Sequence, residues 1–84
     1  MRRVWWTRAA ERQLHAAANY LESARSGYGR RFVDAVENAL AIAAEYPYVN
    51  PVAPDEPEHT RKALVSRFGY WIIYEVKEDG IVVL

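Results

Sequence analysis

The sequence of 84 residues contains no cysteine, which excludes a disulfide framework, a cysteine-ligated metal site and a thiol nucleophile. It has no apolar run near the ~20 residues that a membrane-spanning helix needs. The segment between the basic N-terminus and Arg8 is too short to form the apolar centre of a signal peptide. Neither of the two histidines has a partner at metal-ligand spacing, so we expect no metal site and no cofactor. Together these absences predict a small cytoplasmic protein.

The sequence also lacks net charge, since 11 basic residues balance 11 acidic ones. The balance conceals an asymmetry. Residues 1–31 carry seven arginines and two glutamates, a net charge of +5, and residues 32–84 carry −5. Proteins that bind nucleic acid by neutralising phosphates are usually basic overall. The charge pattern therefore favours a protein partner over direct binding of nucleic acid.

The first half of the chain predicts a short strand followed by a helical hairpin. Residues 3–6 are rich in strand-forming types, and Thr7 can cap the helix that follows. Apolar residues then recur at helical spacing over residues 8 to about 25 and again over 30–46, where Pro47 ends the pattern. The two glycines in residues 26–29 predict a tight connection. Two amphipathic helices joined in this way form an antiparallel hairpin.

The second half predicts a connection and then three strands. Residues 47 to about 59 hold all four prolines and the acidic cluster of Asp55, Glu56 and Glu58, which is typical of a solvated crossing segment. The expected strands are residues 61–67, 70–76 and 81–84. We expect the strand at 70–76 to be central, with its beginning covered on both faces. The fold is thus α+β, a helical hairpin packed on a small, mainly antiparallel sheet in the order β-α-α-β-β-β within one domain, residues 1–84.

Three cations and two aromatic residues around the predicted strands are candidate binding residues. Arg61, Lys62 and Arg67 bracket the strand at 61–67. They can form a cationic patch for a partner, or they can be the charges that protect an edge strand from aggregation. Tyr70 and Trp71 can supply aromatic contacts to an interface, although a core position is the favoured interpretation for aromatic residues on a central strand.

The order of the elements and several motifs resemble the RelE/ParE superfamily of bacterial toxins. The similarity begins at residues 4–14, continues through Tyr46-Pro47 and is densest at residues 67–76 and 79–83. The resemblance implies the toxin of a type II toxin–antitoxin system, neutralised by a cognate antitoxin through which it can oligomerise. Relative to that family, the chain stops within its last strand, and we expect it to lack the usual C-terminal segment.

Two branches of this superfamily act differently, and the residues favour one of them. In RelE-like members, which cleave messenger RNA on the ribosome, the chemistry is supplied by two lysines two residues apart, an arginine after the Gly-Tyr pair, and an arginine and a tyrosine near the C-terminus. The last two positions fall beyond Leu84. Lys62 matches the first lysine, but Leu64 and Trp71 occupy the positions of the second lysine and the first arginine, so Lys62 is the only candidate catalytic residue. The resemblance therefore implies the ParE-like branch, which is associated with DNA gyrase. The alternatives are a RelE-like ribonuclease and an inactive, truncated toxin that only binds the antitoxin.

The apolar last strand suggests where an antitoxin binds. Because residues 81–84 are all apolar, we expect an open strand edge around Val83 onto which an antitoxin strand adds. If the chain itself encloses this strand, the antitoxin is to be sought on the helical hairpin, where Arg8 and Arg12 lie one turn apart.

Overall fold

The computed structural model describes residues 2–54 and 59–84, so the acidic cluster at Asp55, Glu56 and Glu58 lies outside the described residues. The elements follow one another as β1 (Arg3–Trp6), α1 (Arg8–Ala24), α2 (Tyr28–Glu45), β2 (Thr60–Val65), β3 (Tyr70–Lys77) and β4 (Gly80–Val83). This order confirms the predicted α+β fold. Neither helix is long and apolar enough to cross a membrane, as far as the described residues go.

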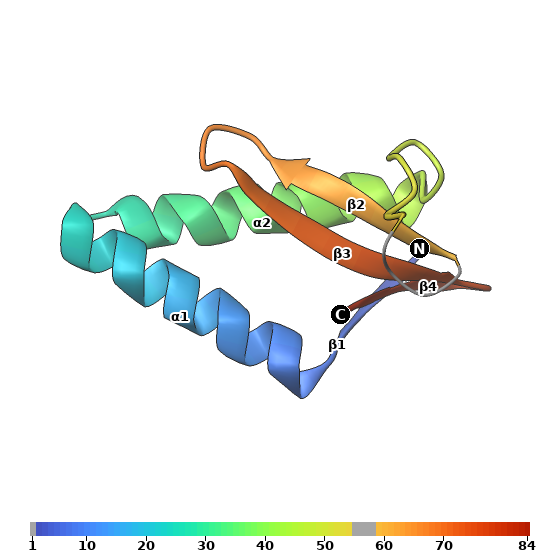
Figure 1. The fold of residues 1–84 in the computed structure, drawn as a ribbon, viewed down its shortest axis with the longest axis horizontal. Helices are drawn as coiled ribbons and strands as arrows, with labels where there is room; N and C mark the ends of the chain where they lie inside the picture. The colour runs from blue at the N-terminus through green and yellow to red at the C-terminus, as the bar shows by residue number, and fades with distance from the viewer. Residues whose placement is uncertain (1, 55–58) are drawn as a thin grey trace.

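The four strands form one sheet in the order β1-β4-β3-β2 (Figure 1). β1 runs parallel to β4, whereas β4 with β3 and β3 with β2 are antiparallel, so the sheet is mainly antiparallel as predicted. β4 therefore lies between two strands of its own chain, and Val83 pairs with Trp6 on one side and Tyr74 on the other. The predicted open edge at Val83 is wrong, because the parallel pairing of β1 covers it. Val83 is 3% exposed.

The hydrophobic core lies between α2 and one face of the sheet, which we call the inner face. α2 contributes Phe32, Val36 and Leu40, which are all buried. The strands contribute buried residues that alternate along their length: Ala63, Val65, Ile72, Tyr74, Ile81 and Val83. α1 packs mainly on α2, and Figure 1 shows it running away from the sheet. The hairpin is therefore attached to the sheet through α2.

The two helices approach each other closely beside the connection that joins them. The chain reverses over residues 25–27, where Gly27 has φ +85°, and α2 begins at Tyr28 and not at residue 30 as predicted. The carboxylate of Glu22 accepts hydrogen bonds of 3.0 Å from the backbone N–H groups of Gly27 and Gly29. A Cβ atom at Gly29 would lie 2.6 Å from the carbonyl oxygen of Ala18. Only glycine allows this close approach of α2 to α1.

Tyr74 ties the segment after α2 to the sheet. Its side chain is fully buried at 0% exposure, and its hydroxyl donates a 2.8 Å hydrogen bond to the carbonyl oxygen of Pro47. The same hydroxyl accepts a 3.1 Å hydrogen bond from Asn50 Nδ2. Farther along, Val52 forms an isolated antiparallel bridge with Arg61. This segment follows turns and the bridge, in agreement with the predicted irregular connection.

Candidate functional site

The face of the sheet opposite α2, which we call the outer face, is the first candidate site. Side chains alternate between the two faces of a strand. The outer face therefore carries residues from all four strands: Trp5, Lys62, Leu64, Trp71, Ile73, Glu75 and Val82. No described helix covers it, and most of these side chains are apolar. An exposed apolar sheet face of this kind is typical of an interaction surface.

A cluster of three residues lies at the β2–β3 end of the outer face. Leu64 pairs directly with Trp71 across the two strands, and the Lys62 ammonium lies 4.6 Å from the centre of the Trp71 ring. Trp71 is 52% exposed and Leu64 is 51% exposed. The favoured core position of Trp71 is therefore wrong, and so is the expectation that the beginning of β3 is covered on both faces. The reason is that both helices lie on the inner side of the sheet.

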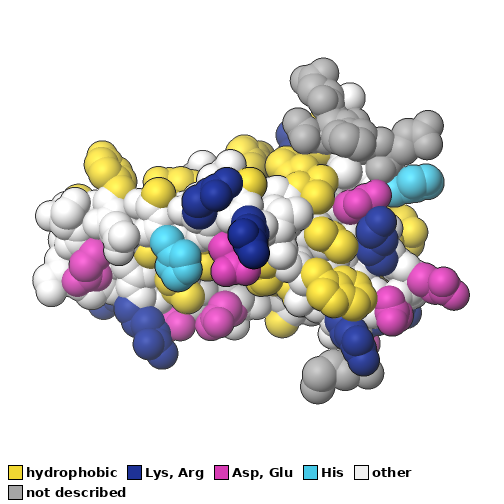
Figure 2. Space-filling view, turned by 90° about the horizontal axis from the view of Figure 1, so that it is seen from below, with side chains coloured by type: hydrophobic (Ala, Val, Ile, Leu, Met, Phe, Trp, Pro, Cys, Tyr) yellow, Lys and Arg dark blue, Asp and Glu magenta, His cyan; other side chains and the backbone are white. Residues whose placement is uncertain are grey.

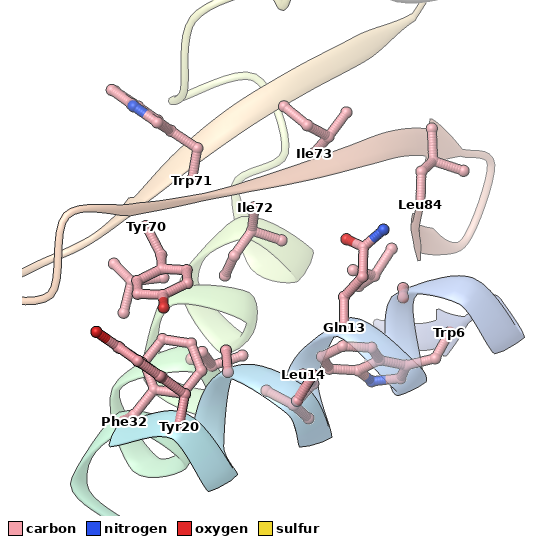
Figure 3. Close-up of a pocket in the computed structure, with 16 residues that line it drawn as sticks. Trp6, Gln13, Leu14, Tyr20, Phe32, Tyr70, Trp71, Ile72, Ile73 and Leu84 are labelled. Atoms are coloured by element: carbon pink, nitrogen blue, oxygen red, sulfur yellow. The ribbon is translucent and has the colours of Figure 1, made fainter. Parts of the chain in front are cut away.

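Tyr70, by contrast, points to the inner side, as Figure 3 shows. Its ring centre lies 4.9 Å from that of Phe32 on α2, and the residue is half-buried. Phe68 completes the contact, because its ring lies 5.1 Å from Tyr28 and 5.4 Å from Phe32. This aromatic cluster fixes the β2–β3 turn on the first turns of α2. Tyr70 thus packs against the core but is only partly buried, so the predicted core position holds in part.

The remaining cations of the predicted patch, Arg61 and Arg67, are not part of the Lys62–Trp71 contact. Arg61 points to the opposite side of β2, where its guanidinium lies 5.0 Å from the centre of the Tyr48 ring and donates a 2.9 Å hydrogen bond to the carbonyl oxygen of Asn50. Arg67 is exposed in the β2–β3 turn and has φ +75°. Arg61 thus holds the segment after α2, whereas Lys62 faces the outer side.

Two features of the titratable groups bear on the site, an ion pair on β3 and a buried tyrosine hydroxyl. The Glu75 carboxylate forms an ion pair of 3.3 Å with the Lys77 ammonium on the same strand. Burial raises the pKa of Tyr74, an effect opposed by its hydrogen bond with Asn50 and by the charge of Arg61, but this hydroxyl lies on the inner side. Among residues 2–54 and 59–84, no group of three or more His, Cys, Asp or Glu side chains is arranged to hold a metal ion.

A groove of about 500 Å³ between α1 and β3 is the second candidate site (Figure 3). Gln13, Leu14 and Tyr20 line it from α1, while residues 70–73 line it from β3. Trp6, Val83 and Leu84 line it as well. Sequence reasoning missed this groove. The sequence shows the apolar stripe of α1. It does not show that the sheet leaves part of this stripe uncovered, because that depends on the direction of α1 relative to the sheet.

Arg8 and Arg12 lie one turn apart on α1, as their spacing predicts, and both are exposed. Glu11 lies between them in the sequence and is exposed too. Figure 2 views the molecule from the α1 side and shows basic and acidic side chains interspersed there. This side therefore carries no broad patch of one charge sign, and the two arginines are separate cations on a mixed surface.

Comparison with known proteins identifies the family. Residues 4–84, nearly the whole chain, match the sequence model of the ParE toxin of the type II toxin–antitoxin system parDE. The chain matches no curated protein and no solved structure. The family match agrees with the order of elements and with the motifs on β1, β3 and β4. The chain belongs to the ParE toxin family of type II toxin–antitoxin systems.

Proposed function

We propose that this protein is a ParE-like toxin of the cytoplasm that targets DNA gyrase and does not cleave RNA. The outer face of the sheet binds this target. Its family implies a cognate antitoxin as the partner that neutralises it. The observation that carries the proposal is the cluster of Lys62, Leu64 and Trp71 on the outer face.

Cleavage of RNA by its own 2′-hydroxyl needs a base for that hydroxyl, an acid for the leaving oxygen and cations on the phosphate. The RelE-like pattern places basic residues where Leu64 and Trp71 stand. Here Lys62 is a single cation whose ammonium lies over the Trp71 ring, a contact of about 0.5–1 kcal/mol at an exposed site. Loss of a single charge-stabilising group typically slows an enzyme by about 10²–10³-fold. Two such positions are apolar here, which argues against a ribonuclease.

The same cluster suits contact with a protein. Hot spots of protein interfaces are enriched in tryptophan and are surrounded by contacts that exclude water. Trp71 is exposed beside the aliphatic Leu64 and Ile73, and Lys62 stands at the edge of this apolar group. An exposed indole that contacts a cation and aliphatic side chains is suited to burial in an interface with a partner.

The proposal is tested with purified toxin in two assays, supercoiling by DNA gyrase and primer extension on translating ribosomes. We expect inhibition of supercoiling and no codon-specific cuts in messenger RNA. Trp71→Ala should raise the inhibitory concentration at least tenfold, about 1.4 kcal/mol, because it removes the exposed indole. Tyr46→Ala is the matched control, since Tyr46 is also an exposed aromatic residue but lies at the end of α2.

Two results would contradict the proposal. Ribosome-dependent cuts that disappear in Lys62→Ala would make the protein a RelE-like ribonuclease. A chain that binds its antitoxin but neither inhibits gyrase nor arrests growth would be an antitoxin-binding module without a target.

A further inference from the structure

Lys62 is a cation placed among apolar side chains on the outer face. It lies on β2, an outermost strand of the sheet, from which a lysine side chain can extend into water. Its ammonium instead lies 4.6 Å from the centre of the Trp71 ring on the neighbouring strand. Ile73, which pairs with Lys62, points to the same side of β3 as Trp71 (Figure 3). A protein surface that covers Trp71 must therefore also cover this ammonium.

The positive charge of Lys62 is not neutralised on the outer face. Glu75 lies on the same face, but its carboxylate forms an ion pair of 3.3 Å with the Lys77 ammonium. Lys62 itself forms no ion pair within the part of the chain that the structure describes. Arg67, which is exposed in the β2–β3 turn, adds a second positive charge near Trp71. This end of the outer face is therefore complementary to a negative charge.

Covering Trp71 would remove water from the Lys62 ammonium. A charge that leaves water opposes binding unless an opposite charge or hydrogen-bond acceptors replace the lost hydration. The face of the indole attracts the ammonium, but this attraction offsets only part of the cost. A carboxylate of the partner, placed opposite Lys62, would supply the missing interaction. Leu64, which is 51% exposed beside Trp71, requires apolar side chains around that carboxylate.

Phosphate oxygens of a nucleic acid are the other anions that can neutralise a lysine. The charge of the whole chain disfavours them, because 11 acidic residues balance the 11 basic ones. Proteins that bind nucleic acid through its phosphates are usually basic overall. The carboxylate of Glu75 on the same face would also repel a phosphate backbone. A single carboxylate on a protein surface complements the outer face better.

We infer that the target presents to the outer face an acidic side chain surrounded by apolar ones, with the carboxylate paired to Lys62 and the apolar side chains covering Trp71 and Leu64. Lys62 thus selects the target by charge, while Trp71 and Leu64 supply the contact area. The inference rests on the proposed function, because it describes the surface of the target that the outer face binds.

The first test measures the affinity of toxin variants for DNA gyrase by calorimetry. Lys62→Met keeps an apolar side chain beside Trp71 but removes the charge, and it should weaken binding about tenfold or more. Lys62→Arg keeps the charge and can stack on the ring, so its dissociation constant should stay within about threefold of the wild type. Circular dichroism melts establish that each variant is folded.

Arg25→Met is the matched control. The Arg25 guanidinium also lies over an aromatic ring, 5.7 Å from the centre of Tyr28, but it is exposed at the end of α1. The substitution removes the same charge and the same kind of contact away from the outer face. It should change the dissociation constant for gyrase less than about twofold, because an exposed charge away from an interface has little effect on affinity.

The second test identifies the carboxylate. Exposed aspartates and glutamates of gyrase are replaced by asparagine or glutamine, one at a time. One replacement should weaken binding of the wild type about tenfold but binding of Lys62→Met less than about twofold, because the charge that it paired with is already absent. Added salt should likewise weaken binding of the wild type more than binding of Lys62→Met.

The outcomes distinguish this inference from the proposed function. If Lys62→Met binds gyrase as tightly as the wild type, the inference is overturned, while gyrase remains the target. If that variant also forms oligomers that the wild type does not form, Lys62 protects the outermost strand from association instead. Binding of a single-stranded oligonucleotide that is lost in both Lys62→Met and Trp71→Ala would make phosphate the anion and overturn the inference. A wild type that does not bind gyrase overturns the proposed function itself.

Discussion

Removing the hydroxyl of Tyr74 should weaken the attachment of the segment after α2 to the sheet. In Tyr74→Phe the ring stays in the core, where it is fully buried, and only the oxygen is lost. The carbonyl oxygen of Pro47 then loses a donor at 2.8 Å, and Asn50 Nδ2 loses an acceptor at 3.1 Å. Because Arg61 donates to the carbonyl oxygen of Asn50, the change also loosens the support of that guanidinium.

The expected cost follows from these two hydrogen bonds. A typical intramolecular hydrogen bond contributes about 0.5–1.5 kcal/mol net, so the loss is about 1–3 kcal/mol. Pro47 and Asn50 are half-buried, and water can partly replace the lost hydroxyl, which places the value near the lower end. A chain of this size is expected to have a total stability of only about 4–13 kcal/mol. At about 4–8 °C per kcal/mol, the melting temperature should fall by roughly 5–15 °C.

The pH dependence gives an independent measure of the same hydroxyl. Burial raises the pKa of Tyr74 in the folded protein above its usual value of 10.0. The unfolded chain therefore ionises first as the pH rises, and the stabilisation is complete below about pH 10 and lost as the pH rises through the folded-state pKa. Urea unfolding followed by tryptophan fluorescence should thus show a difference between wild type and Tyr74→Phe that shrinks above about pH 10.

Tyr48→Phe is the control for this prediction, because Tyr48 is exposed and its ring, which Arg61 contacts, is retained. It should change the free energy of unfolding by less than about 0.5 kcal/mol. A Tyr74→Phe protein as stable as the wild type, or a difference that grows with alkaline pH, would refute the reasoning from the hydrogen bonds.

Three further substitutions test the local geometry. Gly29→Ala should lower the free energy of unfolding by about 1–3 kcal/mol in urea, since its Cβ would lie 2.6 Å from the Ala18 carbonyl oxygen; unchanged stability would contradict the close helix contact. Arg67→Gly should raise the melting temperature by a few degrees, about 0.5–1 kcal/mol, because Arg67 has φ +75°; a lower melting temperature would mean that its side chain stabilises the turn. Thr7→Ala should cost about 0.5–2 kcal/mol in thermal unfolding, because Thr7 Oγ1 accepts a 3.1 Å hydrogen bond from the Ala10 N–H, whereas Thr7→Ser should cost little.

The sequence by itself determined the elements, because their signals are local. Helical spacing and the capping hydroxyl of Thr7 predict α1, and the oxygen accepts the hydrogen bond that this reasoning requires. Alternation along residues 70–76 separated the two faces of β3 correctly, with Tyr70 on one side and Trp71 on the other. The order of elements and the motifs were also sufficient to recognise the family.

The sequence could not decide which surfaces the folded chain covers. β1 enters beside β4, a pairing of residues almost a chain length apart, and this contact encloses Val83. Glu22 and Arg25 have the spacing of a surface ion pair, yet the Glu22 carboxylate instead binds the N–H groups of Gly27 and Gly29. Once the chain reverses between the helices, these N–H groups are better partners for the Glu22 carboxylate than Arg25 is. The reason is that the first N–H groups of a helix have no acceptor within the helix.

The candidate site also depends on which surfaces the folded chain covers. The sequence supplied Lys62, Leu64 and Trp71, but their meeting on an uncovered face follows from the register of β2 with β3 and from both helices lying on the other side. The groove beside Trp71 likewise exists because α1 packs on α2 and diverges from the sheet. Spacing within a segment fixes which side chains share a face. Only the packing of whole elements against one another decides which of those faces is buried and which is left for a partner.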